Sequence, residues 1–439
     1  MNGFSMRKHV ILIFVFSLFL KGFSQDTLKI SKAEMEQKIL ENNLQVKLAK
    51  DEAKLAQAEL LQTRALYLPN VNASYTYTHT NNPLYAFGSK LNQERIAMMD
   101  FDPASLNNPK SISNFATKLE VQQPLVNMDA VYQKKAGQVK AEVMKIKAER
   151  TQEYIQFEFK KAYMQLQLAY RMVETLENAK KTTLENKKVI DNYFKNGLIQ
   201  KTEVLYIDVR VKEIENQLAY AKSNVRNASD YLLFLLDEDY INKVLLPSEK
   251  LEYQSQMLDQ NASFNVDRKD LQAYEKSLEA YNYMIKSSKA KFLPRLNAFG
   301  SYELYDHKFA SFNANGYLAG VQLSWNIFDG LKSKSDAAKY KAELTKAQTE
   351  VAQYTKQSQL EFNKASRQVS DADNKVNLAK MALEQSKEAY RIRKNRYDQG
   401  LEKASDLLMS ETTRSQKDLE YQQAIFEYNV AEAYYQFLK

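Results

Sequence analysis

The sequence contains no cysteine, only seven prolines and only ten glycines among its 439 residues. Without cysteine the chain has no disulfide, no thiolate metal site, no cysteine nucleophile and no cysteine for a lipid anchor. No apolar run reaches the ~18 residues that a membrane-spanning helix needs. Proline and glycine interrupt helices, so their scarcity permits helices of unusual length.

The chain also has few residues that carry catalysis. His9 lies near the N-terminus, and His79 and His307 are isolated, which is more typical of surface residues than of metal ligands. The adjacent Met98 and Met99 are better explained as loop residues than as a soft-metal site. No phosphate-binding glycine loop, HExxH or GxSxG motif is present. We predict that the protein is not an enzyme and binds no cofactor or metal.

The N-terminal segment has the features of a secretory signal in the expected order. Arg7 and Lys8 precede the apolar run Val10–Leu20, and small residues follow up to Ser24. We therefore predict a signal peptide over residues 1–24, in preference to a short buried helix. Its removal lowers the formal charge from +8 to about +5. No concentrated basic patch remains, so we predict no nucleic-acid partner.

Long stretches have the periodicity of helices in coiled coils. We predict helices over 129–195 and 202–236 in the first half and over 331–396 and 402–438 in the second. Both of the longest carry an alanine-rich stripe at spacings of seven, which predicts supercoiled packing at close approach: Ala141, Ala148, Ile155, Ala162, Ala169 and Leu176, then Ala337, Leu344, Val351, Ser358, Ala365, Ala372 and Ala379. At 1.5 Å per residue each would be roughly 100 Å long. A helix over Ser31–Leu66 is about half as long, so two short helices laid end to end would match one long helix in a tubular bundle.

Four segments alternate between apolar and polar residues with the period of a β-strand. Residues 71–80 alternate strictly, with Val71, Ala73, Tyr75 and Tyr77 on one side. Weaker alternation predicts strands over 115–126, 296–305 and 317–328. Residues 81–114 contain three prolines and are predicted to form a loop.

The second half of the chain repeats the plan of the first. Four landmarks recur in the same order: Asn43-Leu44-Gln45 as Asp270-Leu271-Gln272, Tyr67-Leu68-Pro69 as Phe292-Leu293-Pro294, Leu119 and Val121 as Val321 and Leu323, and Asn196-Gly197-Leu198 as Gln399-Gly400-Leu401. We divide the mature chain into a first repeat, 25–236, a connector, 237–267, and a second repeat, 268–439. The connector has the least structural pattern of the three.

The predicted strands are long enough to cross a bilayer when tilted. Four strands cannot close a barrel, because lipid forbids an unpaired edge and about eight strands are the minimum. Closure must then come from oligomerisation, with eight strands in a dimer or twelve in a trimer. Five aromatic residues would supply an interfacial girdle: Tyr75, Tyr77, Tyr302, Tyr305 and Trp325. A soluble protein with two small hairpins would not explain the signal peptide, strands and heptads together.

In this doubled order the landmarks resemble the TolC family of outer-membrane efflux proteins over nearly the whole mature chain. They include Glu41-Asn42-Asn43-Leu44, Leu68-Pro69, Leu293-Pro294, Asn326-Ile327-Phe328-Asp329-Gly330 and the two glycine turns. The resemblance implies an α+β membrane protein, a homotrimer with a twelve-stranded β-barrel and a periplasmic α-barrel of coiled-coil helices. It implies passive export through the cell outer membrane, in a tripartite efflux or type I secretion system. The implied partners are outer-membrane lipid, a periplasmic adaptor (membrane fusion) protein and an inner-membrane transporter.

The resemblance also implies roles for residues near the two turns. Gly197, Leu198, Gly400 and Leu401 match the family's tip turns, which meet the adaptor. Asp406 matches an acidic residue of the ring that narrows the periplasmic entrance, and Tyr397 matches a tyrosine that helps to hold the closed state. Glu203 occupies the position of Asp406 in the first repeat. For Glu203 we favour the simpler role of an acid that complements a helix dipole, and for Asp406 we weight that role and the gate equally.

Two residues depart from the family pattern. Met409 stands at the family's second acidic position, and Glu402 stands where a basic residue is expected after the turn. A closed-state latch would therefore need other partners in this chain.

Two other classes of protein are alternatives to the channel. A periplasmic coiled-coil adaptor would need only helical hairpins and would lack four alternating strands. A secreted hydrolase with paired carboxylates would need a compact concave site, which heptad helices do not provide.

Overall fold

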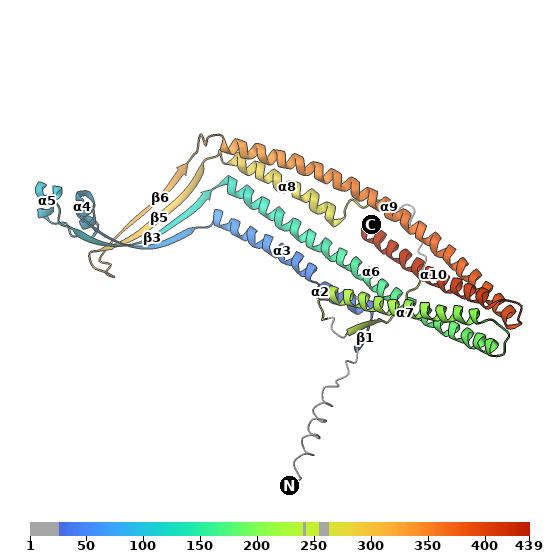
Figure 1. Ribbon diagram of the computed structural model, residues 1–439. Coiled ribbons are helices and arrows are strands. Elements are labelled where there is room, and N and C mark those ends of the chain that lie inside the picture. The colour runs from blue at the N-terminus through green and yellow to red at the C-terminus, as the bar shows by residue number, and fades with distance from the viewer. Residues whose placement is uncertain (1–25, 240–242, 254–262) are drawn as a thin grey trace, which may run out of the picture. The chain divides into compact units, whose positions relative to one another are not determined.

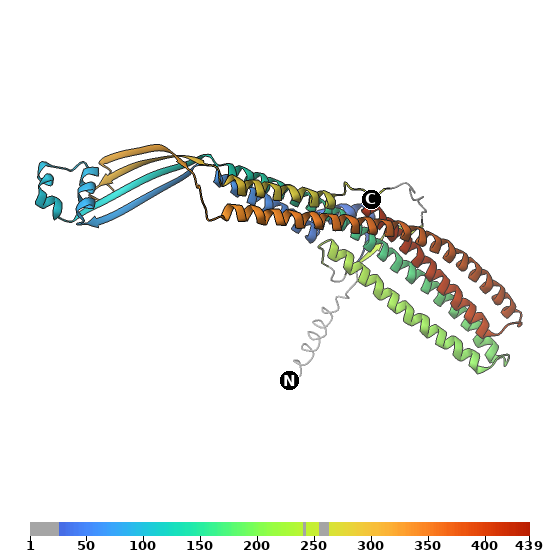
Figure 2. The same ribbon diagram turned by 90° about the horizontal axis from the view of Figure 1, so that it is seen from above.

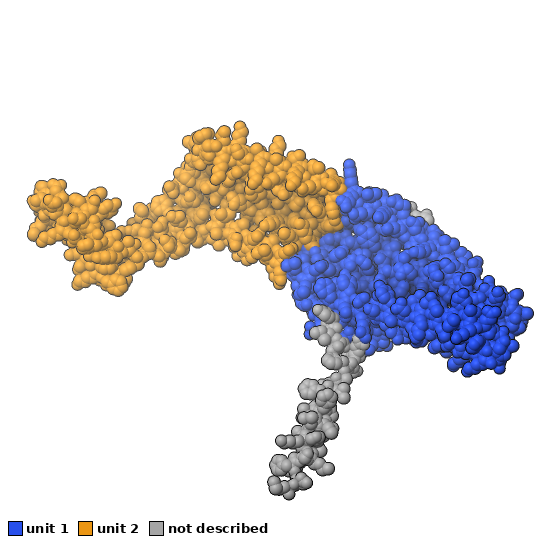
Figure 3. All heavy atoms as spheres, in the orientation of Figure 1, with its two compact units in different colours: residues 1–49, 148–268, 355–439 blue, residues 50–147, 269–354 orange. Residues whose placement is uncertain are grey.

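The computed structural model describes residues 26–239, 243–253 and 263–439, so the predicted signal peptide lies outside the described residues. The chain forms two compact units (Figure 3). Unit 1 contains residues up to 49, 148–268 and 355–439, and unit 2 contains 50–147 and 269–354. The two longest helices contain residues of both units, and all strands of the larger sheet belong to unit 2.

Four long helices begin and end within two residues of the predicted bounds. They are α6 (Met128–Lys195), α7 (Lys201–Leu235), α9 (Lys332–Asp398) and α10 (Ala404–Leu438). All six residues of the α6 stripe are buried, with alanine at four of the six positions, as close helix packing requires. In unit 1, the α6–α7 and α9–α10 hairpins end beside each other (Figures 1 and 2).

The single helix predicted over Ser31–Leu66 was wrong. The structure has α2 (Lys32–Asn42), α3 (Leu44–Gln62) and a 3-10 turn, η1 (Thr63–Leu66). Asn43 makes the break, because its buried side-chain oxygen accepts from the backbone N–H of Gln45 at the start of α3. Its amide nitrogen donates to the Leu235 carbonyl at the end of α7, at 2.8 Å. In the second repeat, α8 (Lys269–Ala290) takes the place of α3.

The larger sheet has four antiparallel strands in the order β2-β3-β5-β6. Their bounds are β2 (Asn70–Thr80), β3 (Ile112–Val126), β5 (Arg295–Asp306) and β6 (Ala314–Ser324). β2 and β5 run away from α3 and α8, and β3 and β6 return toward α6 and α9 (Figure 1). The pairing of β3 with β5 shifts at a bulge between Pro124 and Val126, where proline is tolerated within a sheet. β2 and β6 each pair on one side only, so the sheet has two open edges.

Two predicted boundaries in unit 2 were wrong. The loop 81–114 contains α4 (Pro83–Asn92), a 3-10 turn, η2 (Met98–Phe101), and α5 (Pro103–Asn107). Pro83 and Pro103 open α4 and α5, with Asn82 and Asp102 as caps, and proline is compatible with a first helical turn. The last strand ends at Ser324, not at residue 328, because the chain turns through Gly330 and Leu331, both at positive φ, into α9.

The connector is more structured than its sequence predicted. Its β4 (Lys243–Pro247) pairs in parallel with β1 (Asp26–Ile30). This two-stranded sheet packs on the core of unit 1, where Phe159, Leu232 and Leu245 are buried together. The Tyr163 hydroxyl contacts the Glu249 carboxylate just after β4, and the Tyr170 hydroxyl donates to the Leu245 carbonyl within β4. These contacts fix β4, and with it the N-terminal strand β1, to α6.

Candidate functional site

The two faces of the four-stranded sheet differ in chemistry. In the paired register, one face presents an apolar row that crosses all four strands at Ala73, Leu119, Tyr302 and Tyr317. Residues of both outer strands on this face, such as Val71 and Val321, are exposed although they are apolar. The opposite face carries Lys118, whose ammonium lies 3.1 Å from Glu120 and 3.6 Å from Glu303. A sheet with one exposed apolar face and one charged face can separate lipid from water.

The structure divides the predicted interfacial aromatics among three places. Tyr75, Tyr77 and Tyr302 lie on the apolar face. Tyr305 lies on the charged face, because it stands two residues from Glu303, and its hydroxyl contacts that carboxylate. Trp325 lies just beyond β6, where its indole N–H donates to the Phe292 carbonyl at 2.9 Å.

Three aromatic residues beyond the predicted girdle lie on the apolar face or its rim. Phe115 contacts Tyr75 and Tyr77, and Phe309, in the loop between β5 and β6, packs edge-on against Tyr75 and Phe115. Tyr317 on β6 is among the most exposed aromatics of the described chain. The alternation over 115–126 placed Phe115 on the apolar side of its strand, whereas the loop position of Phe309 carried no pattern signal.

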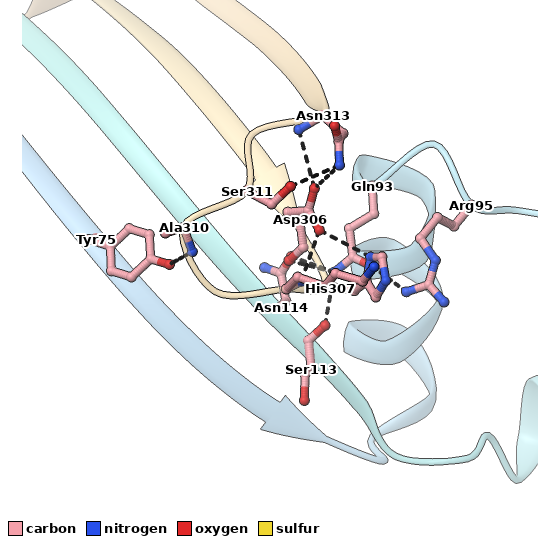
Figure 4. A network of polar contacts seen from close by, with 11 residues as sticks. Tyr75, Gln93, Arg95, Ser113, Asn114, Asp306, His307, Ala310, Ser311 and Asn313 are labelled. Atoms are coloured by element: carbon pink, nitrogen blue, oxygen red, sulfur yellow. Dashed lines mark hydrogen bonds and ion pairs between the residues drawn. The ribbon is translucent and has the colours of Figure 1, made fainter.

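A polar network joins the loop helices to the end of the sheet (Figure 4). The buried Gln93 amide donates to the Ser113 carbonyl at 3.0 Å, the Asn114 side chain at 2.8 Å and the Asp306 carbonyl at 3.3 Å. The Asp306 carboxylate accepts from the Lys308 backbone N–H and the Asn313 side chain. The loop between β2 and β3 is thus fastened to β3 and β5.

The two helical hairpins end in the same turn. Gly197 and Gly400 have φ of 72° and 75°. The Leu198 N–H donates to the Tyr193 carbonyl and the Leu401 N–H to the Arg396 carbonyl, each at 2.9 Å. Both turns are therefore Schellman caps, which need a residue at positive φ and so favour glycine. Leu198 and Leu401 are exposed and available to a partner.

The structure places Tyr397 inside the tip. Its ring is 3% exposed and packs with Ile190 and Ile207 of the α6–α7 hairpin and with Leu407. Its centroid lies 5.8 Å from that of Tyr193. Its hydroxyl is buried without a hydrogen-bond partner among the described residues. Burial, with Tyr193 and Glu203 nearby, raises the pKa of Tyr397 to about 12.

Glu203 and Asp406 have different surroundings although they occupy equivalent positions. The Glu203 carboxylate accepts from the Ser405 backbone N–H at 3.0 Å, in the first turn of α10. Glu203 thus complements a helix N-terminus, but that of the other hairpin. Asp406 is half-buried, and its side chain pairs with no described residue. Within one chain, Tyr397 and Glu203 both lie where the α6–α7 hairpin contacts the α9–α10 hairpin. Asp406 lies outside this contact.

The residues that depart from the family pattern have their own contacts. The Glu402 carboxylate binds two arginines of α9, at 2.5 Å from Arg393 and 2.8 Å from Arg396. Met409 is largely exposed. Glu402 is therefore satisfied within its own hairpin.

A buried polar cluster above the turns was missed from the sequence. Glu411 on α10 is 0% exposed and contacts the Thr183 hydroxyl and the Asn186 amide of α6, the latter at 3.1 Å. Burial raises the pKa of Glu411, although these hydrogen bonds and the charges of Arg210 and Arg414 oppose the rise. Glu411 follows Leu407 by four residues on the apolar side of α10, and a charged residue at such a position was the available signal.

Within the described residues, no group of three or more His, Asp or Glu side chains is placed to hold a metal ion. In the same part of the chain, no helix combines the length and the apolar character needed to cross a membrane.

Comparison with known proteins gives a consistent assignment. A family model described as outer membrane efflux protein matches residues 36–237 and 264–438. None of the curated proteins compared with the chain matches it. Three similar solved structures, each covering most of both chains, show the same fold. They are a membrane protein from Pseudomonas aeruginosa (TM-score 0.78, 17% identity, 93% of each chain), the CmeC outer membrane channel of Campylobacter jejuni (0.74, 16%, 91% of this chain and 84% of that one) and the open-state MtrE channel of Neisseria gonorrhoeae (0.75, 16%, 92% and 88%).

Proposed function

The chain belongs to the outer membrane efflux protein family, and we propose that three copies of it form one β-barrel and one helical tunnel through which cargo leaves the cell. The family match confirms the predicted resemblance and the channel class. The four-stranded sheet is a feature that an adaptor built of helical hairpins would lack.

The observation that carries the proposal is an open sheet with an exposed apolar face. In lipid, the unpaired backbone groups of β2 and β6 need partners, and β6 of one copy can pair with β2 of the next. Three copies give a barrel of twelve strands and two copies one of eight. The resemblance to the family favours the twelve-stranded trimer. β2 has 11 residues, or about 36 Å of strand. Tilted by roughly 40°, it spans close to the ~30 Å of a hydrocarbon core.

In this assembly the apolar face contacts outer-membrane lipid, and the charged face with Lys118, Glu120 and Glu303 lines a water-filled lumen. The helices extend into the periplasm, where the exposed Leu198 and Leu401 meet a periplasmic adaptor that links to an inner-membrane transporter. Three Asp406 carboxylates near one axis would attract cations at the entrance.

The assembly is tested with the purified mature protein in detergent and in planar bilayers. We expect the mass of three chains and stepwise ion conductance, and we expect Asp406→Ala to change cation selectivity or divalent block. A water-soluble monomer without conductance overturns the channel assembly. An Asp406→Ala channel with unchanged selectivity and block overturns only the carboxylate ring.

The partners are tested by crosslinked pull-down from intact cell envelopes. We expect to recover an adaptor and an inner-membrane transporter from the wild type. Charged replacements at Leu198 and Leu401 should lose the adaptor while conductance stays unchanged.

A further inference from the structure

The loop between β2 and β3 lies over the charged face of the sheet. We call its residues 81–111 the outer insert. Its helix α4 contacts β3 and β6, and the first residues of these strands, Ile112 and Ala314, are buried. Ile112 precedes Lys118 by six residues on β3, and Ala314 is opposite Tyr305 in the register, so both lie on the charged face. The outer insert therefore packs on the face that lines the lumen of the proposed barrel.

Polar contacts hold the outer insert in this place. The buried Gln93 amide, at the end of α4, donates to the Asn114 side chain on the charged face at 2.8 Å (Figure 4). Within the insert, the Lys90 ammonium lies 2.5 Å from the Asp100 carboxylate and joins α4 to η2. The insert is thus a structured element fixed to the ends of the strands.

The outer insert exposes an apolar surface. Leu84, Phe87 and Leu91 follow one another at spacings of three and four, so they share one face of α4. The Phe87 ring packs edge-on against a ring of η2, with centroids 5.8 Å apart. Leu84 is 78% exposed, and Met98 and Met99 of η2 are 88% and 81% exposed. We call Leu84, Leu91, Met98 and Met99 the apolar tip, and exposed apolar groups of this kind mark a surface that another surface covers.

The dimensions of the proposed barrel indicate what covers the apolar tip. Twelve strands about 4.8 Å apart and tilted by roughly 40° enclose a backbone cylinder about 24 Å across. Three helices, each about 10 Å in diameter, fit side by side in a circle about 22 Å across. Because α4 lies on the lumenal side of the strand ends, three copies of it would nearly fill the mouth of the barrel.

We propose that the outer inserts of three copies meet at the barrel axis and form an apolar gate at the outer mouth of the channel. The inference rests on the proposed three-copy barrel and names the element that limits passage at its outer end. The three apolar tips cover one another, so water and ions lose their hydration at this point and are held back. An apolar or amphipathic cargo pays less to pass between the tips, so the gate favours cargo of that class.

The cysteine-free chain allows contact between the tips to be tested by thiol crosslinking in outer membranes. The variants are Leu84→Cys and Met98→Cys, with one thiol per chain, each treated with a short bismaleimide. The control is Phe312→Cys, because Phe312 is 52% exposed in the loop between β5 and β6, whose Phe309 packs on the apolar face. We expect a product of twice the chain mass from both tip variants and none from the control.

Passage through the outer mouth is tested with a reporter thiol, Ser74→Cys, in intact cells. Ser74 is opposite Lys118 in the register and so lies on the charged face. A bulky, polar maleimide added outside the cells reaches this thiol through the outer mouth, so the reaction does not depend on the periplasmic entrance. Replacing all four residues of the apolar tip by serine should raise the labelling rate roughly tenfold, because the inserts no longer exclude water. Phe312→Ser in the same reporter chain should leave the rate unchanged.

The outcomes separate this inference from the proposed assembly. A native trimer whose tip thiols react with a monofunctional maleimide but give no dimer overturns the contact between inserts. Dimers together with an equal labelling rate in the serine variant overturn the gate. Tip thiols that react only with a lipid-soluble maleimide would place the insert in lipid, which also overturns the gate. A monomer in the native membrane overturns the assembly itself.

Discussion

The hairpins α6–α7 and α9–α10 share a backbone turn and differ in what covers their sides. Both turns have a Schellman cap on a glycine at positive φ. Tyr397 is buried against the first hairpin, whereas Phe194, at the matched position, is partly exposed. The two longest helices show the same contrast. All six residues of the heptad stripe on α6 are buried, whereas in the heptad stripe on α9 only Ser358 and Ala365 are buried. The two repeats thus share the backbone conformation of the turn, whereas side chains at matched positions differ in how far the rest of the chain buries them.

The largest expected effect comes from truncating the matched aromatics at the tip. Tyr397→Ala removes a ring buried among Ile190, Ile207 and Leu407 and should lower local stability by about 3–5 kcal/mol. Phe194→Ala removes a ring that is 40% exposed and should cost about 1–2 kcal/mol. Hydrogen exchange of the amides on both sides of each turn measures the two effects. Equal costs would show that Phe194 is covered as tightly in the assembled protein as Tyr397 is within one chain.

A smaller effect is expected at the polar layer above the turns. Glu411→Ala leaves the Asn186 amide and the Thr183 hydroxyl without their buried partner and should cost about 1–3 kcal/mol. The matched control is Asp208→Ala, because Asp208 occupies the same position in the first repeat. Its side chain is 49% exposed and pairs with Lys187, and such pairs contribute at most ~1 kcal/mol. Denaturant unfolding in detergent compares the variants, and an equally large loss for Asp208→Ala would contradict the comparison.

The same hairpins show what the sequence could and could not predict. Heptad spacing and the absence of proline placed the long helices to within two residues, because these signals are local. The break at Asn43 was missed, because the side chain that caps α3 locally is also held by the Leu235 carbonyl, 192 residues away in sequence. Similarly, Glu203 was expected to act as a solvated acid at the start of its own helix, whereas its carboxylate accepts from the Ser405 N–H of the other hairpin. Local pattern predicts elements, whereas tertiary partners decide how a polar residue is used.

The turns themselves should respond equally in the two hairpins. A Cβ at Gly197 or Gly400 would contact nothing within 4 Å, so alanine there costs only backbone strain, about 1 kcal/mol at each site. Gly88 in α4 is a control, because its Cβ would also meet nothing within 4 Å and alanine favours a helix. Thermal unfolding should therefore show Gly197→Ala and Gly400→Ala below the wild type and Gly88→Ala at or above it. A loss at only one turn would mean that the two caps are not equivalent.

The smallest effect is a pH dependence confined to the second hairpin. Burial raises the pKa of Glu411 in the folded protein, so the folded state binds this proton more tightly than the unfolded state. Its contribution is present in full below the unfolded pKa and is lost as the pH rises through the folded value. Glu411→Gln keeps a neutral group that can bond Thr183 and Asn186, so it removes this dependence. Unfolding midpoints measured from pH 4 to pH 8 should fall with rising pH more steeply in the wild type than in Glu411→Gln. Parallel curves would mean that Arg210 and Arg414 hold Glu411 charged in both states, and Asp208→Asn should leave the slope unchanged.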